Sequence, residues 1–195
     1  MRKEDIYNEV INMLNDRIDY KSITLAEVAR RCDMGKSTIY EFVKSKDELV
    51  YESILFYLNK MLKTFVENFE ITTFRKSLKT YIKAVAITMK ANFWLVYPWT
   101  FTDNYSGFLL EEDAKVLEDM LNKGRSIVYT LFSSILEKGA EEDVLYKYDE
   151  NQKNFAFNGL ISSLAGAVSP TFDVESAENQ EFIENLCSCV VKQLN

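Results

Sequence analysis

The sequence predicts an all-α protein in which a small N-terminal module of three short helices is joined by a long helix to a larger helical body. Apolar residues recur with the 3.6-residue period of an amphipathic helix, as in Phe74, Leu78, Tyr81, Val85 and Met89. Only two prolines and six glycines interrupt the 195 residues, so long helices are possible. No stretch shows the sustained apolar and polar alternation of a strand.

The expected helices change character at about residue 46. Short helices with tight connections are expected before this point, and long helices with few breaks after it. The helix that begins at Lys46 has apolar residues on nearly all sides, which suits a connection between two parts. We therefore predict one domain over 1–46 and a second over 47–195. The predicted helices cover 3–16, 25–31, 36–43, 46–69, 74–91, 112–138, 151–168 and 176–194, with a further short helix at 93–101.

Composition excludes several classes of protein. The 23 Lys and Arg residues against 30 Asp and Glu give a formal net charge of −7, which excludes a uniformly basic nucleic-acid coat. The chain has no histidine, so His-based catalytic triads and His-containing metal sites are excluded. An odd count of three cysteines, Cys32, Cys187 and Cys189, suits free thiols in a reducing compartment. Without an apolar leader or a membrane-length run, we expect a soluble, cytoplasmic protein with no metal and no cofactor.

Two N-terminal capping motifs flank the most informative region. Thr24 precedes Glu27 by three residues, and Ser45 precedes Glu48 by three, so each hydroxyl can cap a helix whose carboxylate reaches back to it. Between them, an apolar face beginning at Leu25 is followed by a break at 33–35 and by a second short helix. This pattern predicts a helix-turn-helix. The second helix opens with Lys36, Ser37 and Thr38, whose side chains suit phosphates and base edges.

From Tyr20 to Leu49 the chain reads YKSITLAEVARRCDMGKSTIYEFVKSKDEL, which resembles the N-terminal pattern of the TetR (tetracycline repressor) family of bacterial regulators. The resemblance covers this module, whereas the body matches the family only in helix number and length. It implies a homodimer that binds a double-stranded DNA operator through the module and a small-molecule effector through the body. The matching residues are Tyr20, Thr24, Leu25, Glu27, Val28, Ala29, Met34, Thr38, Ile39, Tyr40, Lys46, Asp47 and Leu49.

Some positions of the module depart from the family pattern. Asp33 replaces the usual turn glycine, Gly35 the serine cap, Ser37 a helix glycine and Val43 the closing phenylalanine. Asp tolerates turn geometry and Gly is an acceptable cap, so these changes do not prevent folding. Glu41 adds a carboxylate to the predicted recognition helix, where it would repel phosphate or accept a hydrogen bond from cytosine.

The resemblance and the residue types together predict the DNA contacts. Residues 1–50 hold nine cationic and ten acidic side chains, a net charge of −1, so DNA binding requires the cations to gather on one face. Alternatives remain: a plain helical hairpin, a core role for Tyr40, and a solvated turn for Lys44. A nucleotide-binding loop at 35–38 is disfavoured because its earlier glycine is Arg30. The predicted DNA-binding residues are Thr24, Lys36, Ser37, Thr38, Tyr40, Lys44 and Lys46.

Seven aromatic residues gather between Phe93 and Phe108. Such a cluster either lines an apolar ligand cavity or forms ordinary core. The family resemblance favours the cavity without indicating the ligand. The candidate effector-binding residues are Trp94, Tyr97, Trp99, Asn104, Arg125, Tyr129 and Asn158.

The last two predicted helices carry small residues beside apolar ones, a pattern that suits either self-association or an internal core. Small residues such as Gly159, Ser162 and Gly166 lie beside Leu160 and Leu164. The resemblance favours a homodimer through these helices. We therefore predict a ligand-responsive repressor that binds a palindromic operator. The alternatives are a TetR-like protein that binds a protein partner and a helical enzyme, for which the sequence shows no nucleophile and base arrangement.

Overall fold

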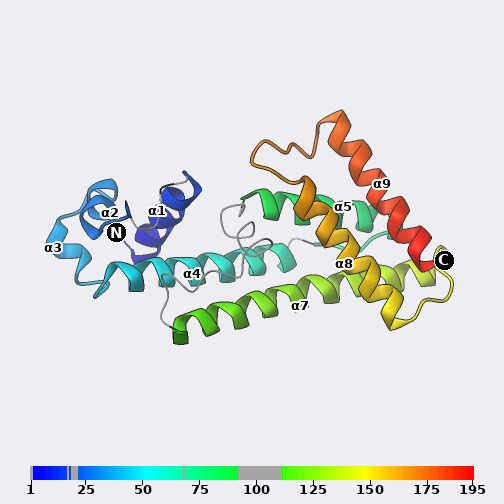
Figure 1. Cartoon of the computed structure of the whole chain (residues 1–195), viewed down its shortest axis with the longest axis horizontal. Helices are drawn as coiled ribbons and strands as arrows, with labels where there is room; N and C mark the ends of the chain where they lie inside the picture. Colours follow the sequence, from blue (N-terminus) through cyan, green and yellow to red (C-terminus); the bar gives the residue numbers. More distant parts are fainter. Residues whose placement is uncertain (1, 17, 19–21, 68, 92–110) are drawn as a thin grey trace. The chain divides into compact units, whose positions relative to one another are not determined.

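The computed structural model describes residues 2–16, 18, 22–67, 69–91 and 111–195, and these residues fold into helices without a strand (Figure 1). The all-α prediction is therefore confirmed for the described chain. The expected helix at 93–101 lies outside the described residues. The helices are α1 (Lys3–Asn15), α2 (Leu25–Arg31), α3 (Lys36–Ile39), α4 (Lys46–Glu67), α5 (Phe74–Ala91), α7 (Glu111–Glu141), α8 (Glu150–Ala167) and α9 (Ala177–Leu194).

Local capping explains where the last two helices begin. The Asp149 carboxylate accepts the backbone amide of Gln152 at 2.8 Å, and the Gln152 side-chain oxygen accepts the amide of Asp149 at 2.9 Å. This reciprocal pair satisfies two backbone groups at the start of α8. The Ser176 hydroxyl accepts the amide of Asn179 at 3.3 Å and starts α9.

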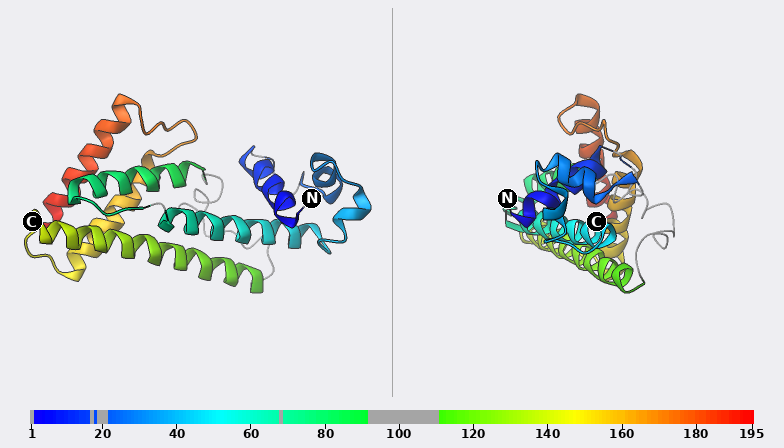
Figure 2. Two further views of the ribbon diagram at one scale, coloured as in Figure 1. Left: turned by 180° about the vertical axis from the view of Figure 1, so that it is seen from behind. Right: turned by 90° about the vertical axis from the view of Figure 1, so that its left-hand side faces the viewer.

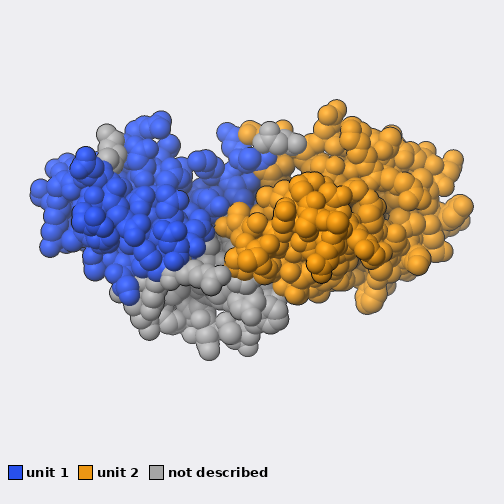
Figure 3. All heavy atoms as spheres, turned by 90° about the horizontal axis from the view of Figure 1, so that it is seen from above, with its two compact units in different colours: residues 1–64, 94–122 blue, residues 65–93, 123–195 orange. Residues whose placement is uncertain are grey.

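The chain divides into two compact units (Figure 3). Unit 1 comprises Met1–Thr64 and Trp94–Asn122, and unit 2 comprises Phe65–Phe93 and Lys123–Asn195. Each unit has its own apolar core. The predicted domains 1–46 and 47–195 were defined by expected function, whereas these two units are defined by compactness. The division at residue 46 therefore stays a prediction.

Unit 1 contains α1, α2 and α3 and the larger part of α4. Its core includes Ile6, Val28, Ile39, Leu49 and Ile54, which are all buried. Each of the four helices therefore contributes to a common core, which holds the short helices together. Burial of this apolar surface stabilises helices that would be too short to form alone.

Unit 2 contains α5, α8, α9 and most of α7. Helices α8 and α9 lie side by side in the views of Figures 1 and 2, and α5 also contacts α9. Two ion pairs link α5 to this region. Lys79 pairs with Glu184 of α9, and Lys83 pairs with Glu175, which lies just before the start of α9. At the centre of the unit the rings of Tyr81 and Phe132 lie 5.8 Å apart between centroids.

Candidate nucleic-acid interface

Thr24 begins α2 as the sequence predicts, but the expected reciprocal capping box does not form. The Thr24 hydroxyl accepts the backbone amide of Glu27 at 3.2 Å. The Glu27 carboxylate instead accepts hydrogen bonds from Arg30 and Arg31, one turn further along the helix. The prediction of the return bond was wrong because two guanidinium groups attract the carboxylate more strongly than a backbone amide.

The turn between α2 and α3 is a Schellman motif built on Asp33. This residue has a φ of 51°, the left-handed conformation that glycine commonly supplies at helix ends. The backbone amide of Met34 donates to the carbonyl oxygen of Ala29 at 2.9 Å. The backbone amide of Asp33 donates to the carbonyl oxygen of Arg30 at 3.2 Å. Aspartate tolerates this conformation, so the departure from the family glycine preserves the turn, as predicted.

Helix α3 is shorter than predicted. It was expected over 36–43, but it ends at Ile39, and Tyr40 is its C-terminal cap. After this point the amides of Glu41 and Phe42 donate to carbonyls three residues earlier, at 3.1 Å each. Gly35 caps the N-terminus without a side-chain hydrogen bond, and β-branched Thr38 and Ile39 disfavour extension. Glu41 therefore lies in the turn that follows α3 rather than on the helix itself.

Five of the predicted DNA-binding residues, Lys36, Ser37, Thr38, Tyr40 and Lys44, lie in α3, at its C-terminal cap or in the turn that follows, whereas Thr24 begins α2 and Lys46 begins α4. Ile39 is fully buried and anchors the helix in the core of unit 1. Tyr40 is 52% exposed, so the alternative core role for this tyrosine is wrong. The remaining predicted contacts are exposed at Thr24, Lys36, Ser37 and Lys44 and partly buried at Thr38 and Lys46.

The N-terminus of α4 lies next to these residues in the chain. The Ser45 hydroxyl accepts the amide of Glu48 at 3.1 Å, which confirms the predicted cap. The Glu48 carboxylate accepts the amide of Lys44 at 2.6 Å rather than that of Ser45, so it reaches one residue further back than expected. Lys46, in the first turn, has its Nζ 3.9 Å from an oxygen of Asp47.

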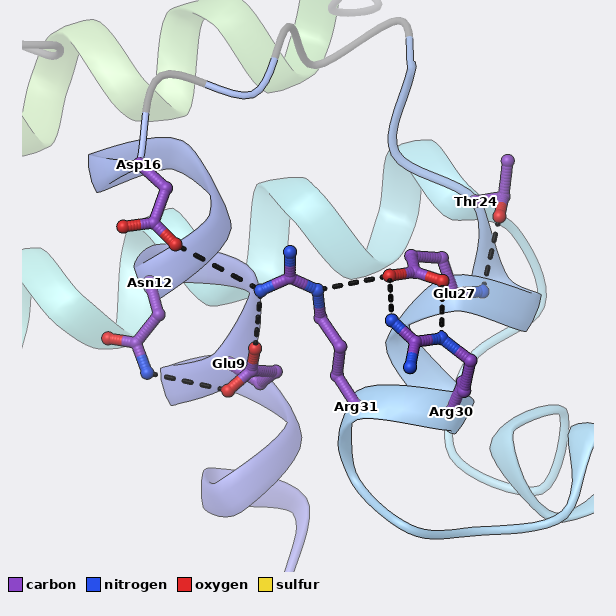
Figure 4. Close-up of polar contacts among 7 residues, drawn as sticks. All are labelled: Glu9, Asn12, Asp16, Thr24, Glu27, Arg30 and Arg31. Atoms are coloured by element: carbon purple, nitrogen blue, oxygen red, sulfur yellow. Dashed lines mark hydrogen bonds and ion pairs between the residues drawn. The ribbon is translucent and has the colours of Figure 1, made fainter.

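Some cations of unit 1 form ion pairs with carboxylates of the protein, and others do not. Lys3 pairs with Glu52 at 2.9 Å, while Arg30 and Arg31 both pair with Glu27 (Figure 4). Within the described chain, Lys36 and Lys44 form no ion pair. These two cations around α3 are therefore available to an external anion, whereas carboxylates of the protein neutralise Lys3, Arg30 and Arg31.

The network around Glu27 was not among the contacts predicted from the sequence. Its signal was present, because Arg30 and Arg31 follow Glu27 at the spacings i+3 and i+4 that bring side chains together on a helix. The further link from Arg31 to Glu9 spans 22 residues and has no comparable local signal.

The candidate effector residues fall into two groups. Trp94, Tyr97, Trp99 and Asn104 lie outside the described residues. Arg125 donates to the Asn158 side-chain oxygen at 2.7 Å, and both residues are exposed, while Tyr129 donates to Glu150. The structure thus joins Arg125 of α7 to Asn158 of α8 through one hydrogen bond. The described residues contain no cluster of potential metal ligands.

The apolar and small residues of α8 face different ways. Leu160 and Leu164 are buried in the core of unit 2, so for these two side chains the structure shows the internal core, one of the two alternatives. Ser162, Ser163 and Gly166 are exposed. The helix therefore buries Leu160 and Leu164 inside the subunit and leaves Ser162, Ser163 and Gly166 uncovered.

Comparison with known proteins supports the fold. No protein-family model and no curated protein matches the chain. Similar solved structures include FadR from Bacillus subtilis in complex with stearoyl-CoA, with 14% identity, a TM-score of 0.65 and full coverage of both chains. The TetR-family regulator PfmR from Thermus thermophilus has 17% identity and a TM-score of 0.63, over 100% of this chain and 98% of PfmR. NemR from E. coli in its reduced form has 15% identity and a TM-score of 0.62, over 99% and 97% of the two chains.

These likenesses and the local geometry define the chain as an all-helical protein with an N-terminal helix-turn-helix. Its fold is that of the TetR-family transcriptional regulators. The resemblance found in the first fifty residues is thus joined by a likeness of fold to these solved structures. None of the helices in the described part of the chain combines the length and the apolar character that a membrane span requires.

Proposed function

We propose that the protein is a DNA-binding transcriptional regulator that acts as a homodimeric repressor at a palindromic operator and responds to a small-molecule effector. The observation that carries this proposal is the set of exposed groups around α3. Lys36, Ser37, Tyr40 and Lys44 are exposed beside a helix that the buried Ile39 holds in place. A rigid helix with exposed donors and cations is suited to DNA.

In this proposal α3 enters the major groove and α2 crosses the phosphate backbone, as in other helix-turn-helix proteins. Lys36, Ser37 and Thr38 would face base edges and nearby phosphates. Tyr40, Thr24 and the lysines Lys44 and Lys46 would contact the backbone and set the orientation of α3. Phosphate contacts of this kind position a protein, whereas base contacts select the sequence.

A dimer would place two α3 helices at the spacing of two half-sites. The exposed small residues of α8 support dimerisation through α8 and α9, because they permit close approach of a second helix pair. Phe155, which is 68% exposed on the same helix, adds apolar surface for a partner to cover. A two-fold dimer of this kind would match a palindromic operator.

The effector would bind in the body and bias the spacing between the two modules. The aromatic residues at 93–108, including Trp94, Tyr97 and Trp99, suit an apolar ligand. FadR, with the same fold, holds stearoyl-CoA in its solved structure. An effector can change DNA affinity only through its different affinities for two conformations, typically about 1 to 3 kcal/mol of coupling.

The test is a selection followed by a titration. Purified protein is incubated with fragmented host genomic DNA at moderate salt, and the bound fragments are sequenced. A recovered palindrome that binds with a steep salt dependence in fluorescence anisotropy supports the proposal. If the folded protein enriches no sequence and binds no DNA even at low salt, the proposal fails.

A protein partner in place of DNA is the second candidate. The exposed carboxylate of Glu41 beside α3 and the net charge of −7 favour it. Such a protein would show no salt-dependent DNA affinity, so the titration separates the two candidates.

A further inference from the structure

The carboxylate of Glu27 holds Arg30 in a bidentate ion pair on the exposed surface of α2 (Figure 4). The Nε of Arg30 donates to Oε2 of Glu27 at 2.8 Å, and its Nη2 donates to Oε1 at 2.7 Å. Nε of Arg31 donates to the same Oε1 at 3.2 Å. One carboxylate therefore occupies both arginines at the end of α2.

The two arginines differ in what else they contact. Arg31 also donates to Glu9 of α1 at 3.2 Å and lies 4.0 Å from Asp16, and its side chain is 29% exposed. It therefore ties α2 to α1. The Arg30 side chain is 72% exposed, and Glu27 is its ion-pair partner in the described chain. Loss of Glu27 would leave Arg31 anchored by α1 and release Arg30.

The position of this pair matters because α2 is the helix that crosses the phosphate backbone in a helix-turn-helix complex. Glu27 follows Thr24, a predicted phosphate contact, by one turn of the same helix. A phosphate and a carboxylate both bind a guanidinium in the same two-point geometry. Phosphate and Glu27 would consequently compete for the donors of Arg30.

We propose that Glu27 is an internal competitor of the DNA phosphates, which lowers the DNA affinity of the module by occupying Arg30. This inference rests on the proposed DNA-binding function. Such competition would keep Arg30, one of the nine cations of residues 1–50, from contributing to DNA binding in a segment whose net charge is already −1. The affinity would then depend more on cations such as Lys36 and Lys44, which form no ion pair in the part of the chain that the structure describes.

The competitor is present under all ordinary conditions. Hydrogen bonds from Arg30 and then Arg31 lower the pKa of Glu27 to about 2, so the carboxylate stays ionised at neutral pH. The competition is therefore a constant property of the folded module.

The test is Glu27→Gln, measured by fluorescence anisotropy with a labelled duplex of mixed sequence over a salt series. The variant should fold, because the Thr24 cap uses the backbone amide of residue 27 and Arg31 keeps its contact with Glu9. Affinity should rise roughly three- to tenfold, and the slope of log K against log salt should steepen by about 0.9 for each module bound. Circular dichroism verifies that the helices are retained.

Two further variants make the result specific. Glu4 is an exposed residue of α1, and its carboxylate makes no ion pair among the described residues. Glu4→Gln should therefore leave the salt slope unchanged. The double variant Glu27→Gln with Arg30→Gln should return the affinity to the wild-type value, because the released guanidinium is then absent.

Three outcomes overturn the inference while leaving the proposed function intact. In the first, the wild type binds DNA as strongly as Glu27→Gln does. In the second, Glu4→Gln raises the DNA affinity as much as Glu27→Gln does. In the third, the double variant keeps the raised DNA affinity. If neither the wild type nor any variant binds DNA, the proposed function itself fails and this inference fails with it.

Discussion

The carboxylate of Glu142, in the turn that follows α7, accepts the backbone amide of Phe74 at the start of α5. The two oxygens lie 3.2 and 3.1 Å from the amide nitrogen, and the residues are 68 positions apart in the chain. A Cβ atom at Gly139 would lie 2.8 Å from the Phe74 ring, so the absence of a side chain there permits this close approach. The start of α5 is therefore held by a distant carboxylate, which also suits the positive end of the helix dipole.

Replacing this cap should destabilise unit 2. Glu142→Ala removes the acceptor and should cost about 1 kcal/mol of unfolding free energy, as for other lost N-terminal caps. Glu142→Gln keeps an oxygen acceptor and should cost less. The measurement is urea unfolding followed by circular dichroism, with the midpoint compared at constant slope.

The adjacent residue supplies the control. Glu141 forms an exposed ion pair with Lys138 at 2.9 Å, and such surface pairs contribute about 0 to 1 kcal/mol. Glu141→Ala should therefore unfold close to the wild type. Equal midpoints for the Glu141 and Glu142 variants would show that the cap adds no stability.

The buried hydroxyl of Tyr81 should make the stability of the protein sensitive to alkaline pH. This hydroxyl donates to the carbonyl of Val128 at 3.0 Å, and burial raises the pKa of Tyr81 above its ordinary value. The folded state thus keeps the proton while the unfolded state releases it above a pH of about 10. Stability from this group is complete below a pH of about 10 and declines as the pH rises further, by up to about 1.4 kcal/mol per pH unit.

Tyr81→Phe tests this linkage. At a pH of about 7 the variant should lose about 1 kcal/mol, the net value of one hydrogen bond. Near a pH of about 11 the difference should shrink or change sign, because the variant has no phenol to ionise. Tyr146→Phe, at a tyrosine that is 76% exposed, should match the wild type at both pH values. A loss for Tyr81→Phe that is the same at both pH values would contradict the assigned linkage.

Contacts close in the chain were predictable from the sequence. The apolar spacing predicted α5 at its observed ends, and the caps at Thr24 and Ser45 were predicted from residue type and position. Both depend on interactions within one helical turn, so the sequence displays them directly. The turn at Asp33 was predictable for the same reason.

Two kinds of interaction were not predictable in this way. One is a side chain with several possible partners nearby in the sequence, and the other is a contact between residues far apart in the sequence. The Glu27 carboxylate could accept either the backbone amide of Thr24 or the guanidinium groups of Arg30 and Arg31. Only the folded geometry decides between these donors. The pairing of Glu142 with Phe74 depends on how α5 and α7 pack. The candidate site followed a similar pattern: the exposed face of α3 was predicted, whereas the end of the helix at Ile39 was not.

The hydroxyl of Tyr40 should contribute to DNA binding without contributing to stability. The side chain is 52% exposed, so Tyr40→Phe should change the unfolding free energy by less than about 0.5 kcal/mol. Loss of one phosphate hydrogen bond should weaken DNA binding by about 1 kcal/mol, or roughly fivefold, as measured by anisotropy. Tyr146→Phe is again the matched control, because it removes an exposed phenol from unit 2. Unchanged binding by Tyr40→Phe would remove this hydroxyl from the set of DNA contacts.

The exposed face of α8 should be sensitive to a bulky charge if it forms the dimer interface. The Ser163 hydroxyl is exposed and donates to the carbonyl of Gly159 at 2.8 Å, and nothing lies within 4 Å of a Cβ placed at Gly166. Ser163→Arg should therefore preserve the fold of unit 2, since arginine favours helix and has room. In a dimer the same arginines would face a second subunit at close range and separate the two chains.

Light scattering after size exclusion measures the mass of wild type and variant. The expected result is a wild-type dimer and a Ser163→Arg monomer with equal helical content, and the monomer should bind the operator more weakly because it reads one half-site. Thr130→Arg is matched to it, because Thr130 is also exposed and donates to a carbonyl four residues earlier, at 2.9 Å. This control should remain dimeric, since α7 is not part of the proposed interface. If Ser163→Arg stays dimeric, subunits must associate through another surface, and the small residues of α8 would need a different explanation.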